Sequence, residues 1–226
     1  NVFALILNFI QSKNYASFKC TKNINMEALM IRDVQNDFLP GGALAVADGD
    51  AIIPIVNNLQ SKFDLVVATQ DWHPLNHKSF ASNHIDKHPF DEILLNGLPQ
   101  VLWPNHCVQG TTGANFSKDL NTDKISAIVR KGMDLEVDSY SGFFDNNKQT
   151  STGLLGLLRE KKVTDVYVCG LAADYCVYFT AKDAVAHGFN TFFIEDATKA
   201  ISIEQYKQIK PELKKNKVVF ISSKEL

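Results

Sequence analysis

Cys176 is the residue of this sequence whose position best suits nucleophilic chemistry. It follows a short apolar run at 166–168 and a small-residue turn at 170–173, and apolar residues at helical spacing come after it over 177–186. A cysteine that begins a helix lies beside unpaired N–H groups and the positive end of the helix dipole, which favours a thiolate. The pattern therefore predicts a strand, a turn and a helix that present a nucleophile. The alternative is a small buried side chain, the commoner place for a free cysteine.

Asp33 and Lys131 are the candidates to activate this cysteine. Asp33 follows an apolar run at 28–31, and its carboxylate could take the proton of the thiol. Lys131 follows another run at 125–129 and could pair with Asp33 while it supplies positive charge to the site. Taken separately, the aspartate could be a turn residue and the lysine a solvated one. Together with Cys176 they form a coherent nucleophilic triad.

Asp71 and His73 predict a metal site. Side chains two positions apart in an extended segment point the same way, so these two could bind one ion. Two histidines and one carboxylate leave positions open for substrate, as in a catalytic site, and suit Zn, Fe or Mn. The sequence offers four histidines as the third ligand, and the alternative for each is a surface histidine in a hydrated loop: His77, His84, His88 and His106.

These residues need a scaffold that brings them together, and the chain alternates between strand and helix patterns. Six apolar runs predict strands, at 28–31, 65–69, 125–129, 166–168, 191–194 and 218–221. Helical spacing recurs at 50–62, 152–161, 177–186 and 203–209, whereas 75–123 has little periodicity. This alternation predicts one α/β domain with a mostly parallel sheet. The carboxyl ends of parallel strands form one edge, where the candidate residues would meet.

The composition limits the class of partner. The chain has 226 residues, a formal net charge of −2 and no long run of Lys or Arg, which argues against nucleic acid or an anionic membrane surface as the main partner. Four cysteines at no framework spacing indicate a reducing compartment, and we expect a cytoplasmic protein. Residues 1–25 begin with an apolar stretch too short to span a membrane, and we expect an extension outside a core domain at 26–226.

Several motifs together resemble the nicotinamidases of the isochorismatase-like hydrolase superfamily, over about residues 27–222. They are Asp33-Val-Gln-Asn-Asp-Phe, Gly41-Gly-Ala-Leu-Ala-Val, Gln70-Asp-Trp-His-Pro, Asn76-His77, Trp103-Pro-Asn-His-Cys-Val-Gln, Lys131-Gly, Asp138-Ser-Tyr-Ser-Gly-Phe-Phe-Asp and Gly170-Leu-Ala-Ala-Asp-Tyr-Cys-Val. The resemblance implies a three-layer, doubly wound α/β/α fold with six strands. It also implies a catalytic triad of Asp33, Lys131 and Cys176, an oxyanion hole at the Ala172 and Cys176 amides, and a cis peptide bond before Ala172.

The same resemblance selects His106 as the third metal ligand beside Asp71 and His73, since the Trp-Pro-x-His-Cys motif carries the ligand in that family. His77 is a further ligand or lies just behind the ligands. The implied cofactor is one divalent ion, zinc first, with iron or manganese as alternatives.

The implied reaction is hydrolysis of nicotinamide to nicotinate and ammonia through a cysteine thioester, as part of NAD salvage, with pyrazinamide as a second substrate. Aromatic side chains would form the walls of the ring pocket: Phe38, Trp72, Trp103 and Tyr140. The partner is thus a small molecule, and a homo-oligomer is compatible with the sequence.

Arg32 departs from the family pattern, which has an aliphatic residue before the first catalytic aspartate. A central parallel strand is buried on both faces, so this guanidinium must find a carboxylate, reach an edge or destabilise the site. Arg32 favours one alternative, a catalytically silent member that binds nicotinamide or a partner. A separate enzymatic alternative is a related amidohydrolase of the superfamily for a carbamoyl or ureido compound.

Overall fold

The computed structural model describes residues 26–226, and its centre is a six-stranded sheet in the order β5-β2-β1-β6-β7-β8. Every neighbouring pair in this sheet is parallel. The strands are β1 (Met26–Arg32), β2 (Leu65–Asp71), β5 (Ala127–Lys131), β6 (Val163–Leu171), β7 (Asn190–Lys199) and β8 (Val219–Ile221). The predicted parallel α/β architecture is therefore confirmed.

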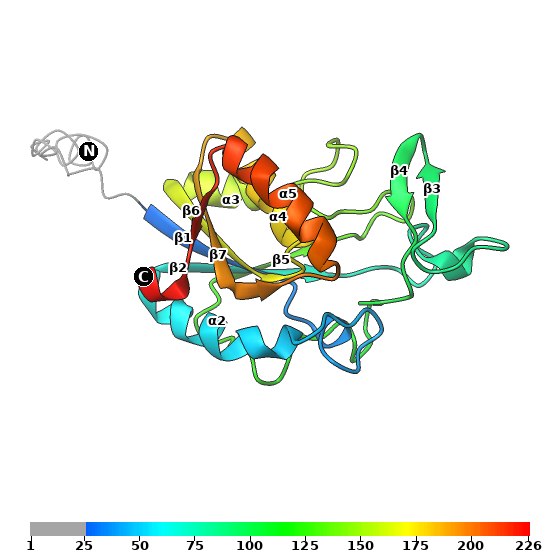
Figure 1. Ribbon diagram of the computed structural model, residues 1–226, viewed down its shortest axis with the longest axis horizontal. Helices are drawn as coiled ribbons and strands as arrows, with labels where there is room; N and C mark the ends of the chain where they lie inside the picture. The colour runs from blue at the N-terminus through cyan, green and yellow to red at the C-terminus, as the bar shows by residue number, and fades with distance from the viewer. Residues whose placement is uncertain (1–25) are drawn as a thin grey trace, which may run out of the picture.

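Helices cover both faces of the sheet and complete three layers. Helix α2 (Ile53–Leu59) lies on one face, whereas α3 (Leu154–Glu160), α4 (Cys176–Ala186) and α5 (Ile203–Lys215) lie on the other (Figure 1). Short 3-10 segments connect these elements at Asn36–Phe38, Gly49–Ile52, Gln60–Lys62, Ala81–Asn83 and Ser223–Glu225. In the described part of the chain, no helix has the length and apolar character needed to cross a membrane.

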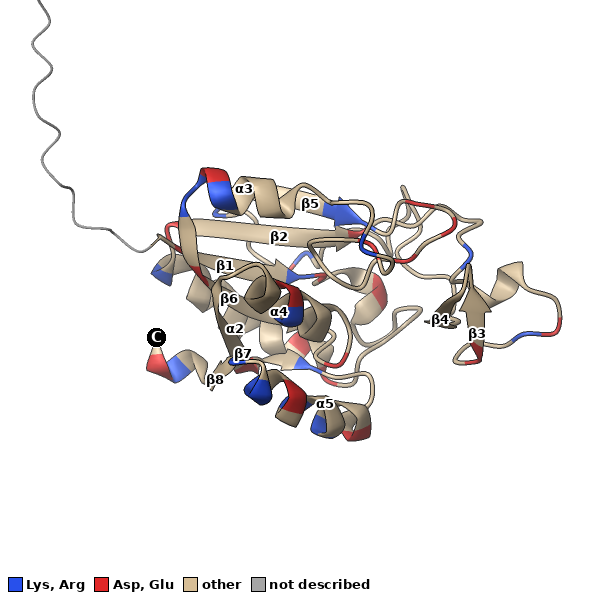
Figure 2. Cartoon of the chain, turned by 90° about the horizontal axis from the view of Figure 1, so that it is seen from above, with Lys and Arg blue, Asp and Glu red and all other residues tan. Residues whose placement is uncertain are grey.

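Strand β1 shows why the strands of this sheet appear as apolar runs in the sequence. Leu29 and Ile31 pack into the core on the α2 side, and Ala28 and Met30 pack into the core below α3 and α4. All four side chains are fully buried, because helices cover both faces of a parallel sheet. Figure 2 shows charged residues on the helices α3, α4 and α5, in loops and near strand ends.

Several boundaries differ from the sequence-based expectation. Strand β5 covers Ala127–Lys131 instead of 125–129, so Lys131 is the last residue of the strand. The predicted helix at 50–62 is interrupted, with α2 between two 3-10 turns. Helix α5 continues to Lys215 through Pro211, because Leu213 beyond the proline is fully buried in the core.

The segment 75–123 contains a hairpin that the periodicity did not predict. Strands β3 (Glu92–Leu95) and β4 (Leu98–Val101) pair antiparallel across a two-residue turn at Asn96 and Gly97. Both turn residues have positive φ angles, 51° and 81°, and Asn-Gly is the dipeptide that favours this turn. The hairpin projects from the end of the domain at which the strands terminate (Figure 1). The predicted extension at 1–25 lies outside the described residues.

Candidate active site

The candidate catalytic residues meet at the carboxyl edge of the sheet. Asp33 follows β1, Lys131 ends β5, and Cys176 is the first residue of α4 after the β6 turn. The Lys131 Nζ lies 3.2 Å from Asp33 Oδ2 and 3.4 Å from Cys176 Sγ. An oxygen of Asp33 lies within 4.8 Å of Cys176 Sγ. All three side chains are buried, so a proton exchanged between them is shielded from solvent.

Lys131 is the cation at the centre of this cluster. Its ammonium donates to Asp71, to the Ser139 carbonyl at 2.9 Å and to Cys176. Burial lowers the pKa of Lys131, but the facing carboxylates of Asp33 and Asp71 outweigh burial and raise this pKa above its usual value. The side chain therefore stays charged throughout the neutral range.

The surroundings of Cys176 oppose the thiolate that a helix start favours. Burial raises the pKa of the Cys176 thiol well above its usual value; the Lys131 charge acts in the opposite direction, and the Asp33 and Asp71 carboxylates add to the increase. The helix start was the reason for expecting a thiolate, but a fully dehydrated sulfur beside two carboxylates favours the neutral thiol. Cys176 thus needs a base when it reacts.

The backbone before Cys176 contains the cis peptide bond that the family resemblance implied. The peptide bond between Leu171 and Ala172 is cis. The Val177 N–H donates to the Ala172 carbonyl at 3.0 Å, which fixes the turn against the helix. The Cys176 N–H belongs to the first turn of α4, where no preceding helical carbonyl accepts it. This N–H is free to face a substrate oxygen.

Asp71, His73 and His106 form a set with one ligand atom each, all within 4.8 Å of one another. The Nδ1 atoms of both histidines face carbonyl oxygens, those of Gly132 and Pro104, each at 2.8 Å. These contacts leave both Nε2 atoms as ligands, the arrangement usual behind protein metal sites. Burial and the His73 charge lower the pKa of His106 to about 4, so it is unprotonated at neutral pH. The donor set fits a divalent ion.

The other histidines lie outside this set. His77 is fully buried, its Nδ1 is 2.7 Å from Ser79 Oγ, and it groups with His73 and Asp138 instead. His84 is half-buried beside the Lys78 carbonyl, and His88 is exposed.

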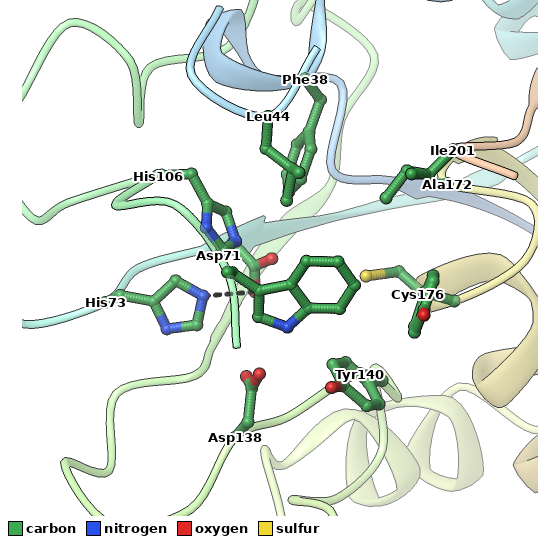
Figure 3. A pocket seen from close by; sticks show the side chains of 12 residues that line it. Phe38, Leu44, Asp71, His73, His106, Asp138, Tyr140, Ala172, Cys176 and Ile201 are labelled. Atoms are coloured by element: carbon green, nitrogen blue, oxygen red, sulfur yellow. Dashed lines mark ion pairs between the residues drawn. The ribbon is translucent and has the colours of Figure 1, made fainter. Parts of the chain in front are cut away.

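One pocket joins the two groups of residues. Asp71, His73 and His106 lie on one side of it and Cys176 lies across from them (Figure 3). Phe38, Trp103 and Tyr140 line the pocket, as the sequence predicted.

Trp72 was predicted to form part of the pocket wall, but the structure places its side chain elsewhere. It is absent from the pocket lining, and its ring packs under the Arg130 guanidinium at 3.9 Å. Asp71 and His73 face the pocket, so the residue between them in an extended segment faces away.

Four lining residues were missed: Leu44, Asp138, Tyr175 and Ile201. Asp138 opens a motif that the sequence analysis quoted without giving this residue a role, and Tyr175 immediately precedes the nucleophile. Leu44 lies within the quoted Gly41-Gly-Ala-Leu-Ala-Val motif, whereas Ile201 carries no local signal, because an aliphatic residue in a loop resembles any core residue.

Comparison with known proteins agrees with this geometry. The isochorismatase domain model matches residues 27–225. A nicotinamidase of Acinetobacter baylyi is 52% identical over 182 residues, which are 80% of this chain and 85% of the relative. The solved structure of an Acinetobacter baumanii nicotinamidase and pyrazinamidase superposes with a TM-score of 0.87 at 49% identity, covering 90% of this chain and 99% of that one.

A second similar structure is the Pyrococcus horikoshii pyrazinamidase in complex with zinc. It has a TM-score of 0.71 and 40% identity, and covers 87% of this chain and 98% of that one. The fold and the buried cysteine site thus define an α/β hydrolase that acts on amides. The chain belongs to the isochorismatase family, and within it the relatives named above are nicotinamidases and pyrazinamidases.

Proposed function

We propose that this chain is a metal-dependent nicotinamidase that hydrolyses nicotinamide to nicotinate and ammonia. The observation that carries the proposal is the position of Cys176 across one small pocket from Asp71, His73 and His106. A nucleophile at one end and a ligand set at the other suit a flat ring with a carboxamide at one end and a nitrogen at the other. The names of the similar proteins support the same substrate.

The reaction begins with the resting thiol of Cys176. Asp33 takes the thiol proton as the sulfur attacks the carboxamide carbon. The Ala172 and Cys176 N–H groups stabilise the oxyanion, and one such donor is worth roughly 3 kcal/mol. Asp33 then gives its proton to the leaving nitrogen, and ammonia departs from a thioester.

Water completes the cycle. Asp33, now ionised again, takes a proton from the water that attacks the thioester carbon. Asp33 returns this proton to the sulfur as the C–S bond breaks, and the released nicotinic acid loses its own proton to solvent and becomes nicotinate. Lys131 remains charged during both halves and offsets the negative charge that passes between Cys176 and Asp33.

Asp71, His73 and His106 would hold one divalent ion, zinc first, with iron or manganese as alternatives. When bound, the ion supplies a Lewis acid that can orient the ring nitrogen. His77 lies behind these ligands beside Ser79 and helps to pack His73, since their ring centroids are 4.6 Å apart.

The aromatic residues that line the pocket predict which substrates it accepts. Phe38, Trp103 and Tyr140 give the pocket aromatic walls that accept nicotinamide or pyrazinamide, which differ by one ring nitrogen. In a cell the reaction would serve NAD salvage in the cytoplasm, with a small molecule as the partner and a homo-oligomer compatible with the fold.

Hydroxylamine tests both the activity and the thioester. The purified protein should release ammonia from nicotinamide, and hydroxylamine should divert nicotinate to the hydroxamate while ammonia release continues. A ureido compound serves as the comparison substrate. Ammonia from the ureido compound but not from nicotinamide would overturn the substrate assignment. Turnover without any hydroxamate would overturn the covalent route.

A further inference from the structure

Arg32 is a charged residue at the base of the site with no place in the reaction above. It ends β1, between β2 and β6, and its side chain is fully buried. From the sequence, this guanidinium could find a carboxylate, reach an edge or destabilise the site. The structure shows the first of these, since the guanidinium lies beside a carboxylate. That carboxylate belongs to Asp33, the proposed base.

The contacts of Arg32 join two parts of the site. Its Nη2 lies 3.5 Å from Asp33 Oδ2 and 3.3 Å from the carbonyl of Tyr140, a pocket wall. The Nε and Nη1 atoms have no hydrogen-bond partner within residues 26–226. Space for the guanidinium comes from Gly142, where a Cβ would lie 2.2 Å from Nη1.

Lys131 cannot hold Asp33 by a hydrogen bond as well. An ammonium has three N–H groups. Those of Lys131 go to Asp71, to the Ser139 carbonyl and to Cys176 Sγ. The contact of Lys131 with Asp33, at 3.2 Å, is thus an ion pair that attracts the carboxylate without fixing its direction.

The two oxygens of Asp33 therefore depend on other donors. The Thr69 hydroxyl donates to Oδ1 at 2.6 Å. Among the described side chains, Arg32 supplies the hydrogen bond to Oδ2, the oxygen that also faces Lys131. Arg32 thus adds a second hydrogen-bond donor to this carboxylate, on the oxygen that Thr69 does not contact.

We propose that Arg32 is a positioning residue for amide hydrolysis, holding Asp33 Oδ2 in the orientation that accepts the Cys176 proton and tying it to the Tyr140 loop. The inference rests on the proposed function. The Arg32 charge also balances the buried charges, since the two cations Arg32 and Lys131 face the two carboxylates of Asp33 and Asp71. A second cation near the sulfur further favours the thiolate as it forms.

Arg32→Met tests this role, because methionine keeps a long side chain and removes the donor and the charge. We expect kcat to fall about ten- to hundredfold with KM within about twofold, as for a misplaced catalytic group. Arg32→Lys should recover part of the loss. The matched control is Met30→Leu, two positions earlier on the same face of β1, and its kinetics should equal those of the wild type.

Alkylation of Cys176 by iodoacetamide separates this inference from the choice of substrate. The rate, followed by mass spectrometry of the Cys176 peptide, should fall in Arg32→Met and stay unchanged in Met30→Leu. An unchanged rate in Arg32→Met would overturn the role of Arg32. Wild-type protein inactive on nicotinamide would overturn the proposed function, while the alkylation series would still decide the inference. If Arg32→Met fails to fold, a Cys176 alkylation rate in Arg32→Asn equal to that of the wild type would overturn the role of Arg32.

Discussion

Gly132→Ala is the substitution whose effect on the metal ligands follows most directly from the structure. Gly132 has a φ of 66°, and a Cβ there would lie 2.3 Å from Cε1 and 2.7 Å from Nδ1 of His73. The imidazole cannot simply move aside, because His77, Phe80 and His106 surround it with ring centroids at 4.6, 5.4 and 5.0 Å. The variant must therefore displace a ligand or distort the backbone.

The expected magnitude has two parts. A left-handed backbone costs a residue with a Cβ about 1–2 kcal/mol, which appears as lost stability. Displacement of His73 from the Gly132 carbonyl also removes the contact that orients this ligand, and loss of such support costs about 10- to 100-fold in metal affinity. This factor corresponds to about 1.4–2.7 kcal/mol of binding free energy.

Zinc affinity, measured by competition with a chromophoric chelator, is the assay. Gly97→Ala is the matched control, since Gly97 has a φ of 81° and no atom within 4 Å of the added Cβ. Both variants should lose stability, but only Gly132→Ala should lose zinc affinity. Equal zinc affinities in the two variants would refute the reasoning.

Three further predictions follow from single side chains. Lys131→Met leaves buried carboxylates without their cation and should lower the free energy of unfolding by about 3–5 kcal/mol in urea titrations, so an unchanged midpoint would contradict it. Trp103→Leu should raise KM for nicotinamide and Trp72→Leu should not, because only the first ring lines the pocket; equal KM values would disprove this. Burial raises the pKa of Asp196, but hydrogen bonds from the 222–223 turn outweigh burial and lower it. Its stabilising effect is therefore present above the unfolded pKa of about 4 and lost at lower pH. Asp196→Asn should lower Tm by about 2 °C at pH 7 and have no effect near pH 2.

The sequence predicted most of the scaffold because burial on both faces leaves a clear signal in a parallel sheet. The apolar run of β1 predicted a central strand, and the chemistry at successive strand ends predicted where Asp33, Lys131 and Cys176 would meet. The hairpin left no clear periodic pattern in the sequence because its strands have only four residues each. The Asn96-Gly97 pair was the signal that could have found it.

The pocket walls were harder to predict, for two different reasons. Trp72 was assigned wrongly although the alternation that paired Asp71 with His73 already directs Trp72 to the other side. Ile201 could not have been found, because the β7–α5 connection brings it to the pocket from a distant part of the chain.

The thiol of Cys176 shows a further limit of sequence analysis. A helix start predicts a low pKa, but the degree of burial and the neighbouring carboxylates decide the outcome, and both come from tertiary structure. The proposed mechanism accordingly gives the Cys176 thiol a base.

Ammonia release from nicotinamide by the wild type, Cys176→Ala and Cys169→Ala tests the central claim most directly. Cys169 is a second buried cysteine, on β6 outside the pocket, and controls for loss of a thiol from the core. We expect turnover by the wild type and by Cys169→Ala, and none by Cys176→Ala. Turnover that survives in Cys176→Ala would contradict the nucleophile and with it the mechanism.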